Sequence, residues 1–455
     1  MSKNQVVCRF APSPSGELHI GNLRTALYSW LYARQNNGTF ILRIENTDRK
    51  RCKDEYTQKI INILKTMGLD WDLFYEQSHR LHIYWTYAHN LMIKNKAYIC
   101  NCPKDFEGEC KCYENYYPES ANKLTNDNEY CIKLRVKELN RDIGCHDEIR
   151  GNINFNTNNL EDIVLFKSDG YPTYHLASCV DDILMEVTDV FRGEEWISSF
   201  PYHTLIYEGL NYKTPKYYHL PLILNVNGQK LSKRDDDFTI DSLLMDGILP
   251  SAIINYTALL GWHPSGNEEF FTLPELLKNF NTTRLNTSSS RYDYKKLKNL
   301  NLKHSKTDQG IKEYYQMYKN QYEEKRLQHL LYVFQNGMEV SRLMSKITNL
   351  NREQITIDQD KIKFFKILIK ELKEMKDHRF NGNADIFLGA TETNIVLQNI
   401  LNCGYNNKQT NEWIREILTG ETKGLPAEIL LSIFTIQELL NMFEKNRISV
   451  SKGII

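Results

Sequence analysis

The sequence lacks an excess of charge of either sign. Its 57 Lys and Arg residues equal its 57 Asp and Glu residues, so the formal net charge at pH 7 is +0. A balanced chain has no global field that attracts a polyanion or a membrane surface. Any binding of nucleic acid must therefore come from local basic faces.

Long apolar runs are also missing. No stretch approaches the ~20 residues that a membrane-spanning helix needs, and the polar start Met-Ser-Lys-Asn-Gln has no apolar segment typical of a signal peptide. These absences lead us to expect a soluble, cytoplasmic protein with no membrane segment.

Cysteine occurs 10 times, but no secretory signal accompanies it. Metal binding then explains clustered cysteines better than a disulfide framework does. The cluster has the form Cys-x-Cys, seven residues, Cys-x-Cys, and consists of Cys100, Cys102, Cys110 and Cys112. Tetrahedral zinc accepts four thiolates, although structural sites more often space each pair more widely. We expect a structural zinc site here, with Tyr113 as an alternative fourth ligand and free thiols as the competing interpretation.

The stretch from Arg9 to Asn22 organises the N-terminal part of the chain. An apolar start predicts a short buried strand, the Pro, Ser and Gly residues that follow cannot extend it, and residues 23–34 have a helical pattern. The backbone N–H groups and dipole at such a helix start suit a phosphate. The spacing matches neither the P-loop nor the dinucleotide fingerprint. We therefore expect a nucleotide site of another kind.

A second motif, Asn-Gly-Gln-Lys-Leu-Ser-Lys-Arg-Asp, occupies residues 227–235. Its clustered cations, with a hydroxyl between them, could neutralise charge that builds up on a polyphosphate. Taken alone, such a loop is usually solvated surface. The functional interpretation becomes stronger because the same chain also contains the stretch from Arg9 to Asn22.

Three motifs together resemble the signatures of class I glutamyl-tRNA synthetases: Arg-Phe-Ala-Pro-Ser-Pro-Ser-Gly-x-Leu-His-Ile-Gly, Phe-Ile-Leu-Arg-Ile-Glu-Asn-Thr-Asp and Lys-Leu-Ser-Lys-Arg. The resemblance continues through residues 165–196 and 219–262. In the rest of the chain it depends only on the chain length and on helical sequence patterns. It implies ATP-dependent ligation of L-glutamate to tRNA(Glu). Glutamyl-adenylate forms first with release of pyrophosphate, and the glutamyl group then passes to the 3′-terminal adenosine of the tRNA.

The resemblance implies catalytic roles for His19, Lys230 and Lys233. The lysines would stabilise the α-phosphate of ATP as the glutamate carboxylate attacks it, and pyrophosphate would leave with magnesium. The implied ATP-binding residues are Pro12, Ser13, His19, Gly21, Asn22, Lys230, Leu231, Ser232, Lys233 and Arg234. Asn22 departs from the family pattern, which has histidine there, and the sequence assigns it no role.

Recognition of glutamate requires two cations for its carboxylates and one anion for its ammonium group. By resemblance, the residues that bind it are Arg9, Ser13, Glu45, Tyr174, Ser178 and Arg192. Arg192 would face the side-chain carboxylate and prefer glutamate to glutamine by charge as well as by hydrogen bonds. Without the motif context, Arg9 and Glu45 would be interpreted as an ordinary ion pair at strand ends. Asn46 replaces the usual Asp of the family, a change that the sequence does not explain.

The expected fold class is α/β plus all-α, with a Rossmann-type parallel-sheet catalytic domain and an all-helical C-terminal part. We expect residues 1–97 and 185–237 to form the two halves of the catalytic domain. Residues 98–184 would be an inserted acceptor-binding domain with the Cys cluster, residues 238–305 a helical stem-contact region, and residues 306–455 an anticodon-binding domain. The clearest helical pattern of the last part runs from Leu425 to Phe443.

Several basic residues between Lys361 and Arg379 share a helical face that would suit tRNA phosphates, and a merely solvated face is an equal alternative. The expected partners are tRNA(Glu), L-glutamate and ATP with Mg²⁺, and the protein would be a monomer. The sequence leaves open whether tRNA(Gln) is also charged. The alternatives are a glutaminyl-tRNA synthetase, the truncated glutamyl-queuosine enzyme, and a catalytically inactive paralogue that binds tRNA. The retained motifs and the long helical C-terminal part disfavour all three.

Overall fold

The computed structural model describes residues 5–103, 110–119, 130–225, 227–229, 238–335, 340, 343–344, 347 and 358–452. The chain divides into two compact units. The first comprises Met1–Leu243 and Pro250–Leu297, and the second comprises Leu244–Leu249 and Lys298–Ile455. Among the described residues, no helix combines the length and apolar character needed to cross a bilayer.

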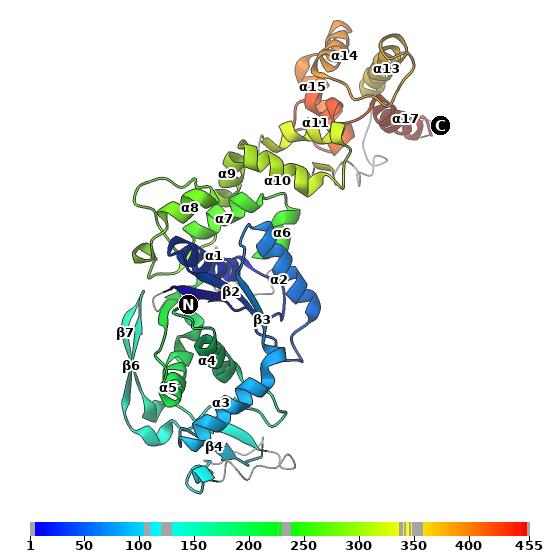
Figure 1. Cartoon of the computed structure of the whole chain (residues 1–455). Coiled ribbons are helices and arrows are strands. Elements are labelled where there is room, and N and C mark those ends of the chain that lie inside the picture. Colours follow the sequence, from blue (N-terminus) through cyan, green and yellow to red (C-terminus); the bar gives the residue numbers. More distant parts are fainter. Residues whose placement is uncertain are drawn as a thin grey trace. The chain divides into compact units, whose positions relative to one another are not determined.

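A seven-stranded sheet organises the first unit (Figure 1). Its strands, in spatial order, are β3 (Leu73–Glu76), β2 (Thr39–Ile44), β1 (Val7–Phe10), β9 (Asp189–Gly193), β10 (Lys216–Leu220), β6 (Asp142–Asp147) and β7 (Gly151–Asn156). All neighbours pair in parallel except β6 and β7, which form an antiparallel hairpin. Strand β1 therefore lies between β2 and β9, which come from widely separated parts of the sequence. The predicted fold class, a parallel-sheet α/β domain with a helical C-terminal part, is confirmed.

Helices cover both faces of this sheet because side chains alternate along its strands. Phe191 and Tyr218 face α1 (Ile20–Gln35), where the ring of Tyr32 lies 5.6 and 5.9 Å from theirs. Val190 and Tyr217 point the other way, into the core formed with α4 (Tyr174–Leu184) and α5 (Phe200–Leu210).

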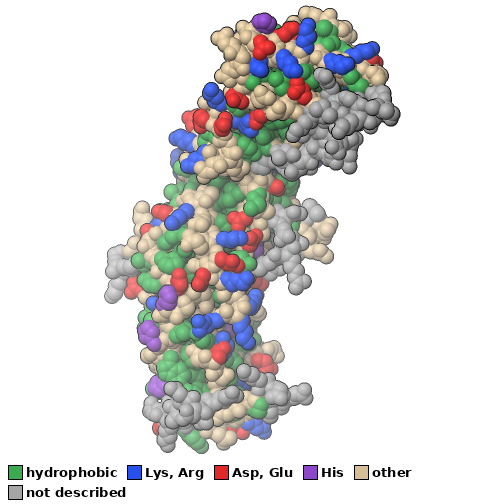
Figure 2. Space-filling view, turned by 90° about the vertical axis from the view of Figure 1, so that its right-hand side faces the viewer, with side chains coloured by type: hydrophobic (Ala, Val, Ile, Leu, Met, Phe, Trp, Pro, Cys, Tyr) green, Lys and Arg blue, Asp and Glu red, His purple; other side chains and the backbone are tan. Residues whose placement is uncertain are grey.

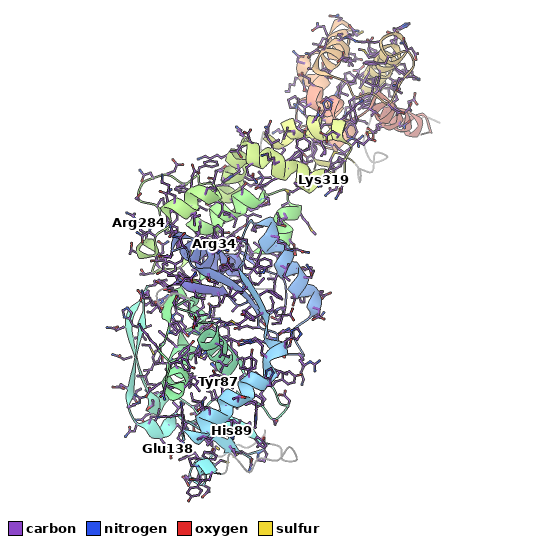
Figure 3. All side chains as sticks on the ribbon, viewed as in Figure 1. Arg34, Tyr87, His89, Glu138, Arg284 and Lys319 are labelled. Atoms are coloured by element: carbon purple, nitrogen blue, oxygen red, sulfur yellow. The ribbon has the colours of Figure 1, made fainter. Side chains whose placement is uncertain are left out.

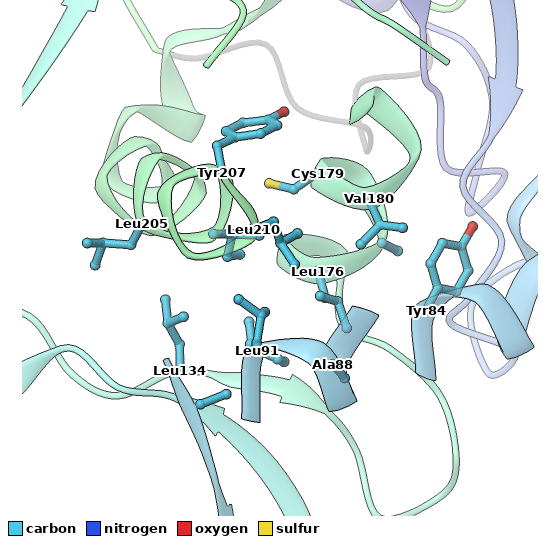
Figure 4. Packing of buried hydrophobic residues seen from close by; sticks show 14 of the residues in the cluster. Tyr84, Ala88, Leu91, Leu134, Leu176, Cys179, Val180, Leu205, Tyr207 and Leu210 are labelled. Carbon is cyan, nitrogen blue, oxygen red and sulfur yellow. The ribbon is translucent and has the colours of Figure 1, made fainter. Parts of the chain in front are cut away.

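Figure 4 shows this second core at close range. Leu91 and Ala88 of α3 (Leu81–Ile93) lie near Leu176 of α4 and Leu210 of α5, and all four side chains are buried. The full burial of these apolar groups is the main stabilising contribution of this layer. Helix α4, which carries predicted site residues, is thus held firmly beneath the sheet.

The end of α1 is fixed to the loop before β3. Arg34, at the C-terminal end of the helix (Figure 3), pairs with Asp72 at 2.7 Å and with Asp70 at 3.1 Å. The same Asp72 carboxylate accepts the backbone N–H of Phe40 in β2. Helix α2 (Asp54–Thr66) follows β2. These contacts set the register between α1 and the sheet edge.

The segment predicted as an insertion contributes to two sheets. Strands β4 (Ala97–Cys100), β5 (Cys131–Leu134) and β8 (Val164–Phe166) form a separate antiparallel sheet. The hairpin of β6 and β7, in contrast, extends the large sheet through its pairing with β10. Domain boundaries in this region stay a prediction.

Short elements complete the first unit after residue 222. Strands β11 (Ile223–Leu224) and β12 (Ser290–Arg291) pair in parallel. The helices that follow are α6 (Ile240–Met245), α7 (Pro250–Leu259), α8 (Leu273–Asn279) and α9 (Tyr294–His304). Helix α7 packs on α1, where Tyr28 donates a 2.8 Å hydrogen bond to the carbonyl of Ala258.

The described part of the second unit is helical. Beyond α9 its helices are α10 (Asp308–Tyr318), α11 (Glu324–Gln335), α13 (Gln359–Glu374), α14 (Ala390–Asn402), α15 (Asn407–Thr419), α16 (Ala427–Ser432) and α17 (Ile436–Lys452). The prediction of one helix from Leu425 to Phe443 is wrong. The chain leaves the helix after Ser432, and Thr435 begins α17 through reciprocal bonds with Glu438.

The basic residues between Lys361 and Arg379 are mostly paired with acids. The pairs are Lys361 with Glu416 at 2.8 Å, Lys363 with Asp360 at 3.8 Å, Lys370 with Glu374 at 3.4 Å, Lys373 with Glu444 at 2.8 Å, Lys376 with Asp377 at 3.9 Å and Arg379 with Glu392 at 2.9 Å. Figure 2 likewise shows cationic and anionic side chains interspersed on the face it presents. This balance favours the interpretation of that region as a solvated face.

Candidate active site

A cavity of about 850 Å³ opens at the carboxyl ends of β1, β2, β9 and β10. Ligands of open parallel sheets bind at this edge, because loops and helix N-termini converge there. Most of the sequence-predicted site residues that the structure describes line it: Arg9, Pro12, Ser13, His19, Gly21, Asn22, Glu45, Tyr174 and Arg192. The fold therefore brings together residues that are far apart in the sequence.

His19 caps helix α1 at one wall of the cavity. Its Nδ1 accepts the backbone N–H of Gly21 at 3.0 Å and that of Asn22 at 3.3 Å, and the Asn22 side chain accepts the His19 N–H at 3.4 Å. This reciprocal arrangement is a capping box. It gives Asn22 a structural role, in capping the helix, that the sequence alone did not indicate. It also places the ring proton of His19 on Nε2, the nitrogen that can donate to a phosphate oxygen.

The capping box refines the expected phosphate contacts. The N–H groups of Gly21 and Asn22 are used by His19, so they do not point into the cavity as free donors. The helix dipole and His19 Nε2 are what this helix start offers to an anion. A Cβ at Gly21 would lie 2.9 Å from Cε1 of His19, so a side chain there would require the His19 ring to shift.

Arg192 also lines the cavity and is buried, with 5% of its surface exposed. Its Nε donates to His219 at 2.9 Å, Nη1 donates to Tyr174 at 3.2 Å and to His203 at 3.2 Å, and Nη2 donates to the carbonyl of Trp196 at 3.1 Å. No carboxylate of the described residues lies within ion-pair distance of this guanidinium. Such a buried cation without an anion is costly unless a ligand supplies one.

The groups around Arg192 are neutral at physiological pH. Burial and the Arg192 charge lower the pKa of His203 well below its ordinary value, and the pKa of His175 falls to about 4 for the same two reasons. Burial also raises the pKa of Tyr174 above its ordinary value. Arg192 is thus the charged group of this subsite.

Arg9 and Glu45 do not pair with each other. Arg9 donates from Nε to Asp182 at 3.1 Å and from Nη1 to the carbonyl of Phe191 at 3.4 Å, whereas Glu45 accepts from Arg43 at 3.1 Å. Arg43 also pairs with Asp182 at 2.7 Å. Asp182 therefore bridges Arg9 and Arg43, and the ordinary ion pair between Arg9 and Glu45 is absent.

Arg43 and Asp182 are buried partners of candidate site residues, and sequence reasoning missed both. Burial would raise the pKa of Asp182, but the adjacent Arg9 and Arg43 hold it below its ordinary value. Burial raises the pKa of Glu45 despite the pull of Arg43 and Arg9. A sequence signal was present, since Arg43 interrupts an apolar strand and Asp182 ends an apolar helical stretch.

The structure does not place Ser178 at the cavity, and it does not describe the predicted site residues of the second motif. Ser178 is buried, accepts from Arg43 at 3.3 Å, and is not among the residues that line the cavity. Lys230, Leu231, Ser232, Lys233 and Arg234 lie outside the described residues. Their predicted contacts with ATP stay predictions.

The four clustered cysteines converge near the small sheet. Their Sγ atoms all lie within 4.8 Å of one another, with Cys100 and Cys110 at 3.5 Å and Cys102 and Cys112 at 3.6 Å. Burial would raise the pKa of Cys110, but hydrogen bonds from the Cys112 backbone and from neighbouring thiols lower it to about 7. Four converging soft ligands fit a tetrahedral zinc ion.

Comparison with known proteins decides between the families that this geometry allows. The family model described as tRNA synthetases class I (E and Q), catalytic domain, matches residues 5–299. The chain belongs to this family. Class I synthetases of this kind use ATP with Mg²⁺, so the nucleotide site expected at the start of α1 accords with the family chemistry.

Curated members of this synthetase family share extended similarity with the chain. A glutamate–tRNA ligase of Finegoldia magna is 40% identical over 334 residues, which are 66% of this chain and 68% of that protein. One of Aquifex aeolicus is 41% identical over 314 residues, or 66% of each chain. The chain thus spans about two thirds of the length of the curated relatives it matches.

Solved structures of the family match over almost the whole chain. A crystal structure of a glutamate tRNA ligase from Elizabethkingia meningosepticum in complex with its amino acid has a TM-score of 0.72 and 28% identity, and the match covers 98% of this chain and 99% of that one. A glutamate-tRNA synthetase from Elizabethkingia anophelis has a TM-score of 0.70. The family predicted from the motifs, class I glutamyl-tRNA synthetase, is confirmed.

Proposed function

We infer that the chain is a glutamate–tRNA ligase that joins L-glutamate to tRNA(Glu) at the expense of ATP. The observation that carries this inference is Arg192, a buried guanidinium that lines the cavity without a carboxylate partner among the described residues. The curated relatives bear this name, and a solved relative of similar fold holds its amino acid.

The buried charges of Arg9, Glu45 and Arg192, taken with their ion-pair partners, favour a ligand with one net negative charge. Arg9, Arg43 and Arg192 contribute three cations, and Asp182 and Glu45 contribute two anions. The nearby Asp181 carboxylate is matched by Arg80 at 2.8 Å. Glutamate carries one net negative charge at neutral pH and restores the balance, whereas glutamine is neutral and leaves the Arg192 charge uncompensated. This difference disfavours a glutaminyl-tRNA synthetase.

Within this pocket we assign one contact to each charged group of glutamate. Arg192 binds the side-chain carboxylate through its remaining N–H at Nη2. Arg9 has no described acceptor at Nη2 and faces the α-carboxylate, and the second oxygen of Glu45 accepts the ammonium group. Ser13 and Tyr174 line the pocket. Ser178 acts through Arg43, which holds Glu45 in place.

The first chemical step is a displacement at the α-phosphate of ATP. The glutamate α-carboxylate, already ionised, attacks phosphorus and forms a carboxyl–phosphate anhydride, and the bond to pyrophosphate breaks. His19 and the dipole of α1 hold phosphate oxygens, and Lys230 and Lys233 neutralise the charge that develops. Mg²⁺ accompanies the pyrophosphate that leaves. No general base is required, so catalysis rests on positioning and electrostatics.

In the second step, a hydroxyl of the 3′-terminal adenosine of the tRNA attacks the activated carbonyl, and AMP leaves. Residues 98–184 and 238–305 bind the acceptor arm, and residues 306–455 bind the anticodon arm. We further propose that the enzyme acts as a monomer in the cytoplasm, where its substrates tRNA and ATP meet.

We propose that Cys100, Cys102, Cys110 and Cys112 bind one structural zinc ion. The support is the convergence of four thiols around a point at the end of β4. A bound zinc ion would cross-link the chain on both sides of residues 104–109 and stabilise the small sheet.

ATP–pyrophosphate exchange in the presence of glutamate and tRNA tests the proposed function. We expect exchange that depends on glutamate and does not occur with glutamine. Absence of exchange with every tRNA would overturn the enzyme assignment and favour an inactive tRNA-binding paralogue. Aminoacylation of tRNA(Glu) and of tRNA(Gln) with glutamate then decides whether one or both tRNAs are charged.

A further inference from the structure

Asp147 is a buried carboxylate at the end of β6 that the reaction itself does not use. One oxygen accepts the backbone N–H groups of Ile149 at 3.0 Å and Arg150 at 2.8 Å. The other accepts from His219 twice, from its backbone N–H at 3.0 Å and from Nδ1 at 2.7 Å. All four contacts need an acceptor, which only an ionised carboxylate supplies in full. Burial would raise the pKa of Asp147, but these contacts, above all that with His219, hold it below its ordinary value.

These contacts fix the tautomer of His219. Because Asp147 accepts from Nδ1, the ring proton lies on Nδ1, and Nε2 keeps its lone pair. Nε2 then accepts from Nε of Arg192 at 2.9 Å. Burial lowers the pKa of His219 despite Asp147, so the ring is neutral and does not repel the guanidinium.

The hydrogen-bonded connection from Asp147 through His219 to Arg192 matters because a guanidinium is planar. Once Nε is held, the directions of Nη1 and Nη2 follow. Of the five N–H groups of Arg192, four have protein acceptors among the described residues, and one at Nη2 is left for a ligand. A rotation of the plane would remove that donor from the cavity.

We propose that Asp147 and His219 are positioning residues that orient Arg192 and thereby set the affinity for the side-chain carboxylate of glutamate. This inference rests on the proposed function and goes beyond it, because it assigns a specificity role to the β6–β7 hairpin. The hairpin joins the large sheet beside β10, and that pairing places Asp147 opposite Tyr217, two residues before His219.

Two substitutions break the connection at different atoms. In Asp147→Asn, one acceptor oxygen becomes an NH₂ group. Facing His219, this group donates to Nδ1 and forces the proton onto Nε2, against Arg192. His219→Phe keeps a ring but removes the acceptor of Nε. We expect each variant to raise the KM for glutamate about tenfold, since a hydrogen bond to a charged group is lost. The kcat and the KM for ATP should stay within about twofold of the wild-type values.

His219→Gln retains an acceptor near the position of Nε2, and we expect it to recover most of the affinity for glutamate. The double variant Asp147→Asn/His219→Phe should bind glutamate no more weakly than His219→Phe alone, because both changes break one connection. Asp189→Asn is the matched control. It removes a different buried carboxylate, on strand β9, which accepts hydrogen bonds from Thr188 and Tyr218.

The measurement is glutamate-dependent ATP–pyrophosphate exchange by the full chain with tRNA, beside thermal unfolding of each variant. An unchanged KM for glutamate in folded variants would overturn the inference, as would additive effects in the double variant or an equal effect of Asp189→Asn. If Asp147→Asn does not fold, the KM values for glutamate of His219→Phe and His219→Gln are compared instead. Equal values would overturn the inference. Failure of the proposed function is distinct, because the wild-type protein would then show no exchange with glutamate.

Discussion

At the scale of single residues, Arg192 is the group on which the proposed recognition of glutamate depends most. It is a fully charged group in a buried subsite whose other members are neutral. A cation in such surroundings interacts strongly with an anionic ligand, because water does not screen it.

Arg192→Gln should therefore weaken glutamate binding. Loss of the charged hydrogen bond costs about 3 kcal/mol, which corresponds to a roughly 100-fold increase in the KM for glutamate. Steady-state exchange at varied glutamate concentrations measures this. Retention of the wild-type KM would contradict the role assigned to Arg192, and the KM for ATP serves as the internal control.

Gly21 is a second residue with a specific requirement. A Cβ at this position would lie 2.9 Å from Cε1 and 3.0 Å from Nδ1 of His19. Gly→Ala within a helix normally stabilises it by about 1 kcal/mol. Gly21→Ala should nevertheless lower kcat/KM for ATP by about tenfold, because it displaces the His19 ring from its cap.

Gly144→Ala is the matched control for this substitution. Its added Cβ would meet the Asn154 side chain at an ordinary 3.6 Å, and Gly144 does not line the cavity. Equal activity of both variants in the exchange assay would contradict the positional role of Gly21.

At the scale of elements, helix ends were harder to predict than helices. The periodic pattern from Leu425 to Phe443 is continuous, yet the structure breaks it before Thr435. The reciprocal bonds of Thr435 and Glu438 start a new helix, and Glu438 also binds Arg326 at 2.6 Å. Periodicity does not register such a break, because apolar residues on both sides contribute to the same core.

Thr435→Ala should destabilise the helical unit that contains α17. Removing a Thr cap costs about 1 kcal/mol. Urea unfolding followed by circular dichroism should show this decrease in the free energy of unfolding. Gln437→Ala is the control and should leave the transition in place, because the exposed Gln437 side chain donates a hydrogen bond to Asn441 of the same helix and takes no part in the cap.

The cysteine cluster gives a prediction for the small sheet. Protein purified without chelator should contain about one equivalent of zinc, and Cys112→Ser should reduce this content. Removing the metal should lower the melting temperature, since a bound ion would cross-link the chain on both sides of residues 104–109. Absence of metal in the wild-type protein would support free thiols instead.

At the scale of the whole molecule, buried histidines link stability to pH. In the unfolded chain they take up protons near their ordinary pKa of about 6.5. In the folded protein burial lowers the pKa of His175 to about 4, and those of His203 and His219 are also lowered. Between these values the unfolded state binds more protons, so the free energy of unfolding decreases as the pH falls through this window.

Thermal unfolding at pH 7.5 and pH 5.5 measures this effect. We expect a lower melting temperature at pH 5.5, and a smaller difference in His175→Gln, which removes one of the titrating groups. Equal melting temperatures of the wild-type protein at both pH values would contradict the assignment of these histidines as neutral in the fold.

The sequence by itself determined the family and the kind of chemistry. Its motifs specify a strand, a turn and a helix start near His19, and local patterning is enough to predict such elements. The cap that His19 and Asn22 form came only from the structure. The family resemblance that these motifs carry marked Arg9, Glu45 and Arg192, which the fold gathers around one cavity.

Only the tertiary structure decided which charges meet. In the fold, Asp182 pairs with Arg9 and Arg43 pairs with Glu45. Asp147 is connected to Arg192 through hydrogen bonds to His219. Except for Arg43 and Glu45, which are two residues apart, these partners are far apart in the sequence. The distant partners have no local signal, because a side-chain contact depends on strand order and register. The order of the sheet therefore determined which guanidinium is left without a carboxylate partner.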